Sequence, residues 1–590
     1  MDTPGRAGVS APASERAAAA LSRAEWQRTI FAAEPARLDL LSLAPSWPLK
    51  ALRIAIHRNS GVELFTAPLA RFLAFAGYAA EFIVGDYDDS LAFGGKVGDT
   101  AADLVWLDPA RYSMPAAEFE AWLAGRLKAR RADADGPILV GLLPSEPRNP
   151  EPGAGAEPGT NSALGTPIDL EEALRDRLAE LAGVTVLPLG EVRTALGAGF
   201  YDLRTVSVTA SPLSNRGSIE VARRLGLVWL PPALEPRIKA IAVDLDGTLY
   251  RGVLGEDGPA ALSLDLDHVA IQATLRDLGR AGVMLALVSR NSAEDVDGLF
   301  AARTDFPLSS ADFAFRATGW GEKAGSIVDA AQRLRIDPSA FLLVDDNIGE
   351  IAAATAAISG LRTLLAADAA DTARALRLYP GLVGYRWGEA DAVRVGDLAA
   401  ADERARVAET AIDTASYLRS LEVMLTFASD PTSQRDRLHE LSMKTNQFNT
   451  ALARLSETEV DRRIASPDCR AVSAALTDRL SASGIIAAVQ THREGDTVVV
   501  DEIAISCRAL GRGLEDVIVG TAVSKAAADL GVTRARFVLV EGPRNEPAQT
   551  YVQALLAEAG GDEAAVLPCL AARVDRVRDA VSIEWSAMPR

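Results

Sequence analysis

Two aspartates at the end of a short apolar run constrain the fold of this chain more than any other feature. The run from Ile238 to Val243 is apolar except for Lys239. Asp244 and Asp246 follow it directly. A short apolar run bounded by polar residues is typical of a buried strand in a parallel sheet. Ligands of open α/β sheets bind at the carboxyl ends of such strands, so we expect both carboxylates at a binding edge.

Three more polar positions follow the same pattern downstream. Ser289 ends the apolar run 283–288, and Asp345 ends the apolar run 341–344. Lys323 lies near the start of an amphipathic helical segment between them. Apolar runs that alternate with helical periodicity are typical of βαβ units, whose parallel strands end at one edge. We therefore expect these side chains to converge with the two aspartates.

These residue types suit phosphoryl transfer assisted by a divalent cation. Asp244 is the expected nucleophile, and Asp246 is the expected general acid and base. Ser289 and Lys323 are expected to bind phosphoryl oxygens. Asp244, Asp246 and Asp345 are expected to hold Mg²⁺, which prefers one or two carboxylates together with substrate phosphate. The alternative is that these residues are ordinary solvated acids at strand ends. This alternative is weaker, because four sequence elements have the order and residue types that the chemistry requires.

The spacing of these positions leaves no room for a sizeable cap domain. About forty residues separate Thr248 from Ser289, and about thirty separate Ser289 from Lys323. A strand, a crossover helix and loops consume most of each interval. Because phosphoryl chemistry needs water to be excluded, another domain or a macromolecular partner is expected to close the site.

The composition limits the possible partners and the compartment. A formal net charge of -19 argues against nucleic acid and anionic membranes as main partners. No apolar run approaches the roughly twenty residues that cross a bilayer, and the N-terminus has no basic and apolar signal. Three cysteines, Cys469, Cys507 and Cys569, are too few for a disulfide framework. The sequence therefore predicts a cytoplasmic protein.

The segment from about 50 to 235 alternates strands and helices, and residues 144–165 within it have the Pro- and Gly-rich composition of a loop. With Ser60 after the first strand, it resembles the SGNH hydrolase fold, in which a serine needs a histidine late in the domain. The four histidines are His57, His268, His439 and His492. None lies between Ser60 and residue 235, so the set lacks its base unless His57 is recruited. We predict a degenerate scaffold.

A glycine-containing loop joins a strand and a helix in the last part of the chain. An alternating strand is expected to begin at about Val498 and to run into Arg508, and the helix is expected from about Leu514 to Leu530. The loop between them carries Arg508, Gly511, Arg512 and Gly513. Backbone N–H groups in such a loop can bind phosphate. The motif resembles the pyrophosphate loop of GNAT acyltransferases, supported by a strand expected over 535–540 and by Asn545 and Tyr551 before a final helix. A turn with solvated arginines is the alternative.

Six short motifs together resemble the FkbH-like branch of the haloacid-dehalogenase-like (HAD) superfamily, over about residues 50 to 590. They are 244–249 (DLDGTL), 252–258 (GVLGEDG), 289–291 (SRN), 344–347 (VDDN), 444–449 (KTNQFN) and 506–513 (SCRALGRG). Three departures flank the expected site. Gly247 stands where asparagine is common, Tyr250-Arg251 replace Trp-Gly, and Asn347-Ile348-Gly349 lack the usual proline.

The resemblance implies a multidomain α/β protein with a capless Rossmannoid HAD-like domain. The expected segments are a tail with one helix (1–35), an SGNH-like α/β domain (36–235), a HAD-like phosphatase domain (236–385), a helical connector (386–430) and a GNAT-like α+β acyltransferase domain (431–590).

The same resemblance implies a function. FkbH-like proteins load a glyceryl unit from 1,3-bisphosphoglycerate onto an acyl carrier protein in polyketide pathways, and they hold the acid meanwhile as an enzyme thioester. Thr248, Arg290 and Asn291 would then also bind phosphate, with Mg²⁺ as the metal. Cys507 would carry the acyl group, since the loop after it favours a thiolate. A buried strand cysteine is the alternative. Phosphopantetheine of the carrier, or coenzyme A, would bind at Arg508, Gly511, Arg512 and Gly513.

Three points stay open in the sequence. A HAD phosphatase fused to an acyl-CoA-dependent N-acyltransferase would form no acyl-enzyme at Cys507, and a scaffold that only binds phosphate would show no Mg²⁺-dependent turnover. Residues 445–449 either line the acyl site or form a turn with capping side chains. An acidic carrier protein would need a basic face on this acidic chain, for which the candidates are Arg508, Arg512, Arg534 and Arg536.

Overall fold

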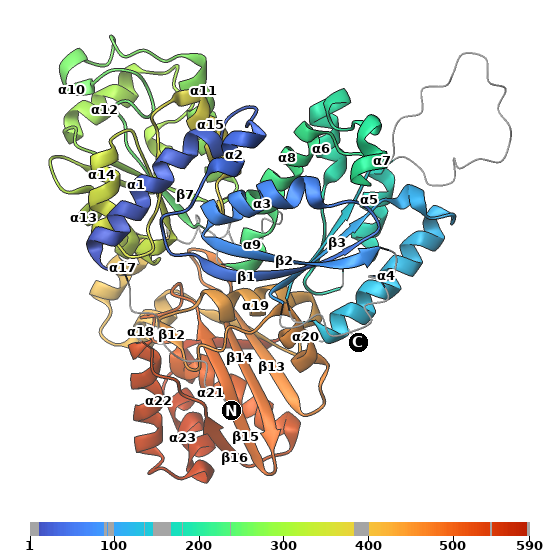
Figure 1. Cartoon of the computed structure of the whole chain (residues 1–590). Helices are drawn as coiled ribbons and strands as arrows, with labels where there is room; N and C mark the ends of the chain where they lie inside the picture. Colours follow the sequence, from blue (N-terminus) through green and yellow to red (C-terminus); the bar gives the residue numbers. More distant parts are fainter. Residues whose placement is uncertain are drawn as a thin grey trace. The chain divides into compact units, whose positions relative to one another are not determined.

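The computed structural model describes residues 11–87, 91, 100–134, 136–144, 167–179, 181–235, 238–382, 400–542 and 545–586. The chain forms two compact units (Figure 1). The first consists of Met1–Gly279, Val283–Arg333 and Asp337–Arg386, and the second of Arg280–Gly282, Leu334–Ile336 and Trp387–Arg590. Nearly all of the loop expected over 144–165 lies outside the described residues.

The first unit contains a five-stranded parallel sheet in the order β2-β1-β3-β4-β5. Its strands are β1 (Lys50–Arg58), β2 (Tyr78–Tyr87), β3 (Ala102–Leu107), β4 (Ile138–Leu142) and β5 (Val184–Val186). Its connections include α3 (Glu63–Ala76), α4 (Ala116–Asp133) and α5 (Pro167–Arg177), and α6 (Leu189–Leu196) and α8 (Asn215–Arg223) follow β5. Strands β3 and β4 are buried at every position, which explains why both are apolar apart from Asp103.

A second parallel sheet of the same unit has the order β10-β9-β6-β7-β8. Its strands are β6 (Ala240–Val243), β7 (Met284–Ser289), β8 (Phe315–Thr318), β9 (Phe341–Asp345) and β10 (Arg362–Leu365). Its helices are α10 (Leu254–Asp257), α11 (Leu266–Arg280), α12 (Ala293–Ala302), α13 (Lys323–Arg333), α14 (Ile348–Ala357) and α15 (Ala369–Leu378).

The chain order changes direction at β6, which is the central strand of this sheet. From β6 the chain adds β7 and β8 on one side, and it then crosses to β9 on the other side. Ligands of open α/β sheets bind at such a switch point. Only α10 and α11 lie between β6 and β7, so the described chain has no cap domain there, as the spacing predicts.

The N-terminal helix α1 (Ala13–Ile30) lies beside α14 and β10 (Figure 1). Leu365 N donates to Gln27 Oε1 at 3.0 Å, and Gln27 Nε2 donates to Thr363 O at 3.5 Å. Because β10 is an edge strand, the helix supplies hydrogen-bond partners to backbone groups that no further strand pairs with.

The second unit has an α+β pattern around one large sheet of order β12-β15-β14-β13-β11-β17, with β16 also paired to β15. The strands are β11 (Met424–Ser429), β12 (Phe448–Asn449), β13 (Cys469–Thr477), β14 (Ala482–Glu494), β15 (Thr497–Ile505), β16 (Arg534–Phe537) and β17 (Ser582–Trp585). The helices are α17 (Ala401–Thr410), α18 (Thr414–Ser420), α19 (Arg435–Lys444), α20 (Glu457–Ala465), α21 (Glu515–Leu530), α22 (Glu546–Glu558) and α23 (Glu563–Asp575).

The end of this unit contains more structure than the sequence expectation. Tyr551 lies before the final helix, as expected, but it is itself part of helix α22, which begins after Asn545 with a proline in its first turn. The chain then continues through α23 and returns as β17, which pairs in parallel with β11. Among the described residues, no helix has the length and apolar character needed to span a membrane.

Candidate active site

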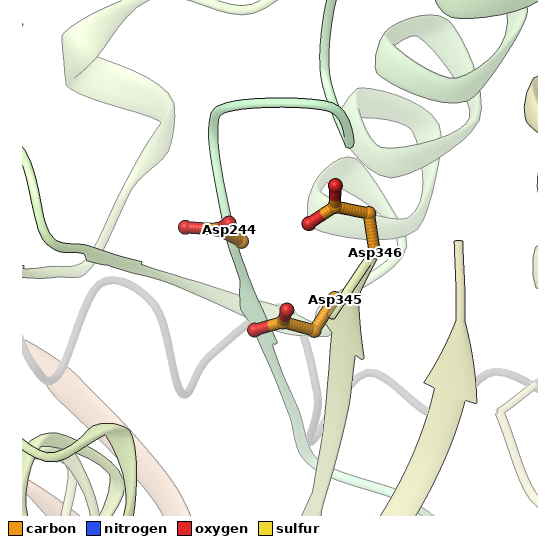
Figure 2. Close-up of side chains that lie close together, drawn as sticks. All are labelled: Asp244, Asp345 and Asp346. Carbon is orange, nitrogen blue, oxygen red and sulfur yellow. The ribbon is translucent and has the colours of Figure 1, made fainter. Parts of the chain in front are cut away.

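Three carboxylates meet where β6 and β9 end (Figure 2). Asp244 directly follows β6, Asp345 is the last residue of β9, and Asp346 follows it. One carboxylate oxygen from each lies within 4.8 Å of the others. Oxygen ligands at this spacing suit a hard divalent cation such as Mg²⁺. The structure thus brings Asp244 and Asp345 together as the sequence predicts, with Asp346 as the third member.

Lys323 is the cation that partly balances this group. It is the first residue of α13, it is buried, and its Nζ lies 3.1 Å from Asp244 Oδ1 and 2.5 Å from Asp345 Oδ2. Burial raises the pKa of Asp244 to about 7, although Lys323 acts in the opposite direction. Burial also raises the pKa of Asp346, with Asp345 adding to the effect. When the three carboxyl groups are ionised, one ammonium leaves a negative excess that a divalent cation would neutralise.

Asp246 does not belong to the carboxylate group. Its Oδ1 accepts hydrogen bonds from Tyr250 Oη at 2.7 Å and from Leu254 N at 2.9 Å. Its Oδ2 accepts from Asn291 Nδ2 at 2.7 Å. These three bonds fix the side chain, and Asp346 takes the third place that was expected of Asp246 in the group that could hold a cation. The Asp246 carboxylate remains available for proton transfer.

Gly247 explains why Asp346 can join the group. Its φ is +69°, in the left-handed region that favours glycine. A Cβ at this position would lie 2.8 Å from Asp346 Cγ and would overlap Asp346 Oδ2. Since glycine has no Cβ, the Asp346 carboxylate can lie against the turn that follows Asp246.

The residues expected to bind phosphate fall into two groups. Ser289 ends β7 in a buried position, and its Oγ accepts from Asn291 N at 3.2 Å and from Asn291 Nδ2 at 3.1 Å. Thr248 is fully buried, and its Oγ1 has no hydrogen-bond partner among the described residues. Buried hydroxyls normally have partners, so a ligand oxygen would satisfy it. Arg290, in contrast, forms an ion pair with Glu350.

Tyr250 is the site residue that sequence reasoning missed as a functional group. It is completely buried behind the turn, and nothing local in the sequence shows that its hydroxyl reaches Asp246. The available signal was its difference from the tryptophan usual in similar sequences. Asp346 also had a signal, since it adjoins Asp345 in the same motif.

The glycine-containing loop of the second unit is already bound to its own surroundings. Arg508 and Arg512 are buried, and Arg512 Nη1 donates to Asp478 Oδ2 at 3.1 Å. Gly511 N donates to Glu515 Oε1 at 3.1 Å. The arginines are therefore not solvated, as the simple-turn interpretation requires. The backbone N–H groups are not all free either, as the phosphate-loop interpretation requires. Cys507 is half-buried directly before it.

The candidates for a basic face do not gather as unpaired surface charges. Arg534 pairs with Glu563 at 3.5 Å, and Arg536 pairs with Glu494. Arg508 and Arg512 are buried. The two surface arginines among these candidates therefore each have a carboxylate partner.

The run 445–449 leads from α19 into the short strand β12, which pairs with β15. Asn449 Nδ2 donates to the buried Glu502 at 2.8 Å, and Asn449 Oδ1 accepts from Leu452 N at 2.8 Å. Arg454 Nη1 donates to Thr445 O at 2.9 Å. These bonds hold the run to its neighbours in the second unit.

The first sheet holds Ser60 in a structural environment. Ser60 is fully buried, and its Oγ donates to Ala210 O at 3.2 Å. His57 Nε2 lies 3.3 Å from Asp103 Oδ1, and the same carboxylate receives two hydrogen bonds from Arg130. Asp103 thus joins the histidine to a buried guanidinium.

Comparisons with known proteins leave the family undetermined. No family model matches the chain, and no curated protein matches it. The N-terminal part of a Bacteroides fragilis protein containing a phosphatase domain, solved with Mg, aligns at 16% identity and a TM-score of 0.44, covering 61% of this chain and 99% of that one. A Mesorhizobium loti protein assigned as a HAD-like phosphatase aligns at 19% identity and a TM-score of 0.19, covering 24% and 88%. Scores this low establish no shared family.

Proposed function

We propose that this chain is a Mg²⁺-dependent HAD-like phosphotransferase with Asp244 as its nucleophile. The observation that carries the proposal is the group of Asp244, Asp345 and Asp346 beside Lys323 at the switch point of a parallel sheet. An all-oxygen donor set fits Mg²⁺, which when bound would neutralise charge on the transferring phosphoryl group.

The residues around this group suit a two-step transfer. A carboxylate oxygen of Asp244 attacks phosphorus while the bond to the leaving oxygen breaks, and Asp246 gives that oxygen a proton. Water then attacks the aspartyl phosphate, its proton goes to Asp246, and phosphate leaves with Asp244 restored. Ser289 and Thr248 lie near these groups with hydroxyls that suit phosphoryl oxygens.

We further propose that the substrate is a phosphorylated three-carbon acid of the 1,3-bisphosphoglycerate type and that its acyl unit passes to an acyl carrier protein. The Cys507 thiolate would attack the carbonyl carbon of the acyl phosphate, and phosphate would leave as the thioester forms. A phosphopantetheine thiolate would then displace Cys507 at the same carbon. The half-buried position of Cys507 directly before residues 508–513 supports this step, together with the FkbH-like motifs.

The loop of the second unit restricts how phosphopantetheine would bind. Arg512 is committed to Asp478, so the loop would offer backbone groups instead of that side chain. A phosphate at Gly511 N would have to replace the carboxylate of Glu515, which now accepts from it. Docking on this loop therefore requires Glu515 to move.

Replacement of the nucleophile tests the proposed activity. Asp244→Asn is nearly isosteric and should abolish the Mg²⁺-dependent release of the ester phosphate at C3 of 1,3-bisphosphoglycerate, whereas the phosphate that Cys507 displaces from the acyl group should still be released. Asp329→Asn is the matched control. It changes an exposed carboxylate on α13, the helix that begins with Lys323, and should leave phosphate release unchanged. Release of the ester phosphate by Asp244→Asn at the wild-type rate would rule out Asp244 as the phosphoryl acceptor.

A further inference from the structure

The Asp246 carboxylate is held asymmetrically by its three donors. Tyr250 Oη and Leu254 N both donate to Oδ1, at 2.7 Å and 2.9 Å, whereas Asn291 Nδ2 alone donates to Oδ2 at 2.7 Å. Each carboxylate oxygen has two acceptor positions in the plane of the group. Both positions of Oδ1 are therefore taken, and one position of Oδ2 remains.

The fold holds the Tyr250 hydroxyl in place as a hydrogen-bond donor to Asp246 Oδ1. The Tyr250 side chain is completely buried, and its ring packs against Phe306 with centroids 5.9 Å apart. Burial raises the pKa of Tyr250 above its ordinary value, and the hydrogen bond to Asp246 raises it further. The hydroxyl thus keeps its proton and continues to point it at Oδ1.

Asn291 connects the other oxygen to the phosphoryl site. Its Nδ2 donates both to Asp246 Oδ2 and to Ser289 Oγ, the latter at 3.1 Å. Ser289 ends β7, next to the central strand that leads into Asp244. The oxygen with the open position is therefore the one tied to a residue expected to bind the phosphoryl group.

We propose that Tyr250 is a positioning residue for Asp246: together with Leu254 N it occupies Oδ1 and leaves Oδ2 as the oxygen that exchanges a proton with the substrate. The inference rests on the proposed phosphotransferase function. In the first step the proton on Oδ2 moves to the leaving oxygen as the phosphorus–oxygen bond breaks. In the second step Oδ2 takes a proton from the attacking water. Tyr250 keeps its own proton in both steps.

This role predicts an effect that depends on the leaving group. An alkyl phosphate such as 3-phosphoglycerate releases an alkoxide, which needs a proton from Asp246 in the transition state. 4-Nitrophenyl phosphate releases a stable phenolate, which needs it much less. Without the Tyr250 hydroxyl, Asp246 can turn or carry its proton on Oδ1, so only proton-dependent cleavage suffers.

The experiment compares kcat/KM for the two esters in the wild type, in Tyr250→Phe and in Tyr379→Phe, with saturating Mg²⁺. Tyr379→Phe is the matched control, since it also removes one buried tyrosine hydroxyl bond, from Tyr379 Oη to Thr363 O at 2.9 Å. Tyr250→Phe keeps the ring and its packing. We expect kcat/KM for 3-phosphoglycerate to fall by about tenfold or more, a part of the 10²–10⁴ that general acid catalysis supplies. The value for 4-nitrophenyl phosphate should change by less than about twofold.

The outcomes separate the inference from the function on which it rests. An equal loss for both esters in Tyr250→Phe, or a matching loss in Tyr379→Phe, is the signature of structural damage and would overturn the positioning role alone. No Mg²⁺-dependent turnover of either ester by the wild-type protein would overturn the proposed function and, with it, the role of Tyr250.

Discussion

At the scale of single residues, the site depends on a position that has no side chain. Gly247 combines a left-handed backbone with a close approach to Asp346, so a side chain would meet both backbone strain and a steric clash. Cys507 is a different case, because its proposed role depends on its neighbours along the chain. Both residues lead to measurable expectations.

Gly247→Ala should weaken Mg²⁺ binding by displacing Asp346. Gly531→Ala is the matched control, because Gly531 has a similar φ of +66° in the left-handed region but no atom within 4 Å of the added Cβ. Both variants should lose stability by about 1–2 kcal/mol from the left-handed backbone. Only Gly247→Ala should raise the Mg²⁺ concentration for half-maximal binding, measured by calorimetry. A similar Mg²⁺ affinity in the two variants would show that Asp346 is not a ligand.

Cys507→Ala should lose the acyl-enzyme adduct. Incubation of the wild type with 1,3-bisphosphoglycerate and no carrier protein should add a glyceryl mass, detected by intact mass spectrometry and removed by hydroxylamine. Cys469→Ala and Cys569→Ala, which change the two other half-buried thiols, should keep the adduct. An adduct that persists in Cys507→Ala would place the acyl group on another residue.

At the scale of elements, helix α1 completes the edge of the second sheet. The chain reaches β10 more than 330 residues after α1, yet Gln27 bonds to backbone groups of that strand. A buried edge without such partners would leave N–H and C=O groups unsatisfied. The helix therefore protects the sheet that carries the aspartate group.

Gln27→Ala should loosen β10 without unfolding the sheet. The variant leaves Leu365 N without its acceptor, which costs about 1–3 kcal/mol locally. Amide hydrogen exchange should accelerate in a peptide covering 362–365, whereas a peptide covering the central strand 240–243 should keep its protection. Unchanged exchange at β10 would mean that the contact with α1 contributes nothing to this edge.

At the scale of the whole molecule, buried carboxylates make stability depend on pH. Glu171 in α5 is buried and accepts from Gly190 N at 3.0 Å. Burial raises the pKa of Glu171 to about 7. The folded chain therefore binds this proton more tightly than the unfolded chain does. Its contribution to stability is full below the ordinary glutamate pKa and disappears as pH rises through about 7.

Glu171→Gln should remove this contribution. The melting temperature of the wild type should fall between pH 5 and pH 8, and the fall should be smaller in the variant, which carries a neutral amide at every pH. The raised pKa of Asp244 also makes stability fall as pH rises. Because both proteins contain Asp244, the difference between their pH profiles reports on Glu171 alone. Equal pH profiles would contradict a raised pKa at Glu171.

The sequence by itself determined the strands and the positions at their ends. Asp244, Ser289 and Asp345 follow apolar runs, and Lys323 begins a helix, as their local patterns predict. These predictions succeed because burial imposes a periodicity that a few neighbouring residues reveal, and because parallel strands all end at one edge. The absence of a cap domain between β6 and β7 followed from length alone.

Only the tertiary structure decided which side chains meet. Asp346 instead of Asp246 joins the carboxylate group because the left-handed turn at Gly247 admits it and because Tyr250 and Asn291 hold Asp246 aside. Arg512 bonds to Asp478, which lies in the loop between β13 and β14. The physical reason is common to these cases: the direction of a side chain after a strand ends depends on backbone turns and on partners distant in sequence, neither of which leaves a local pattern.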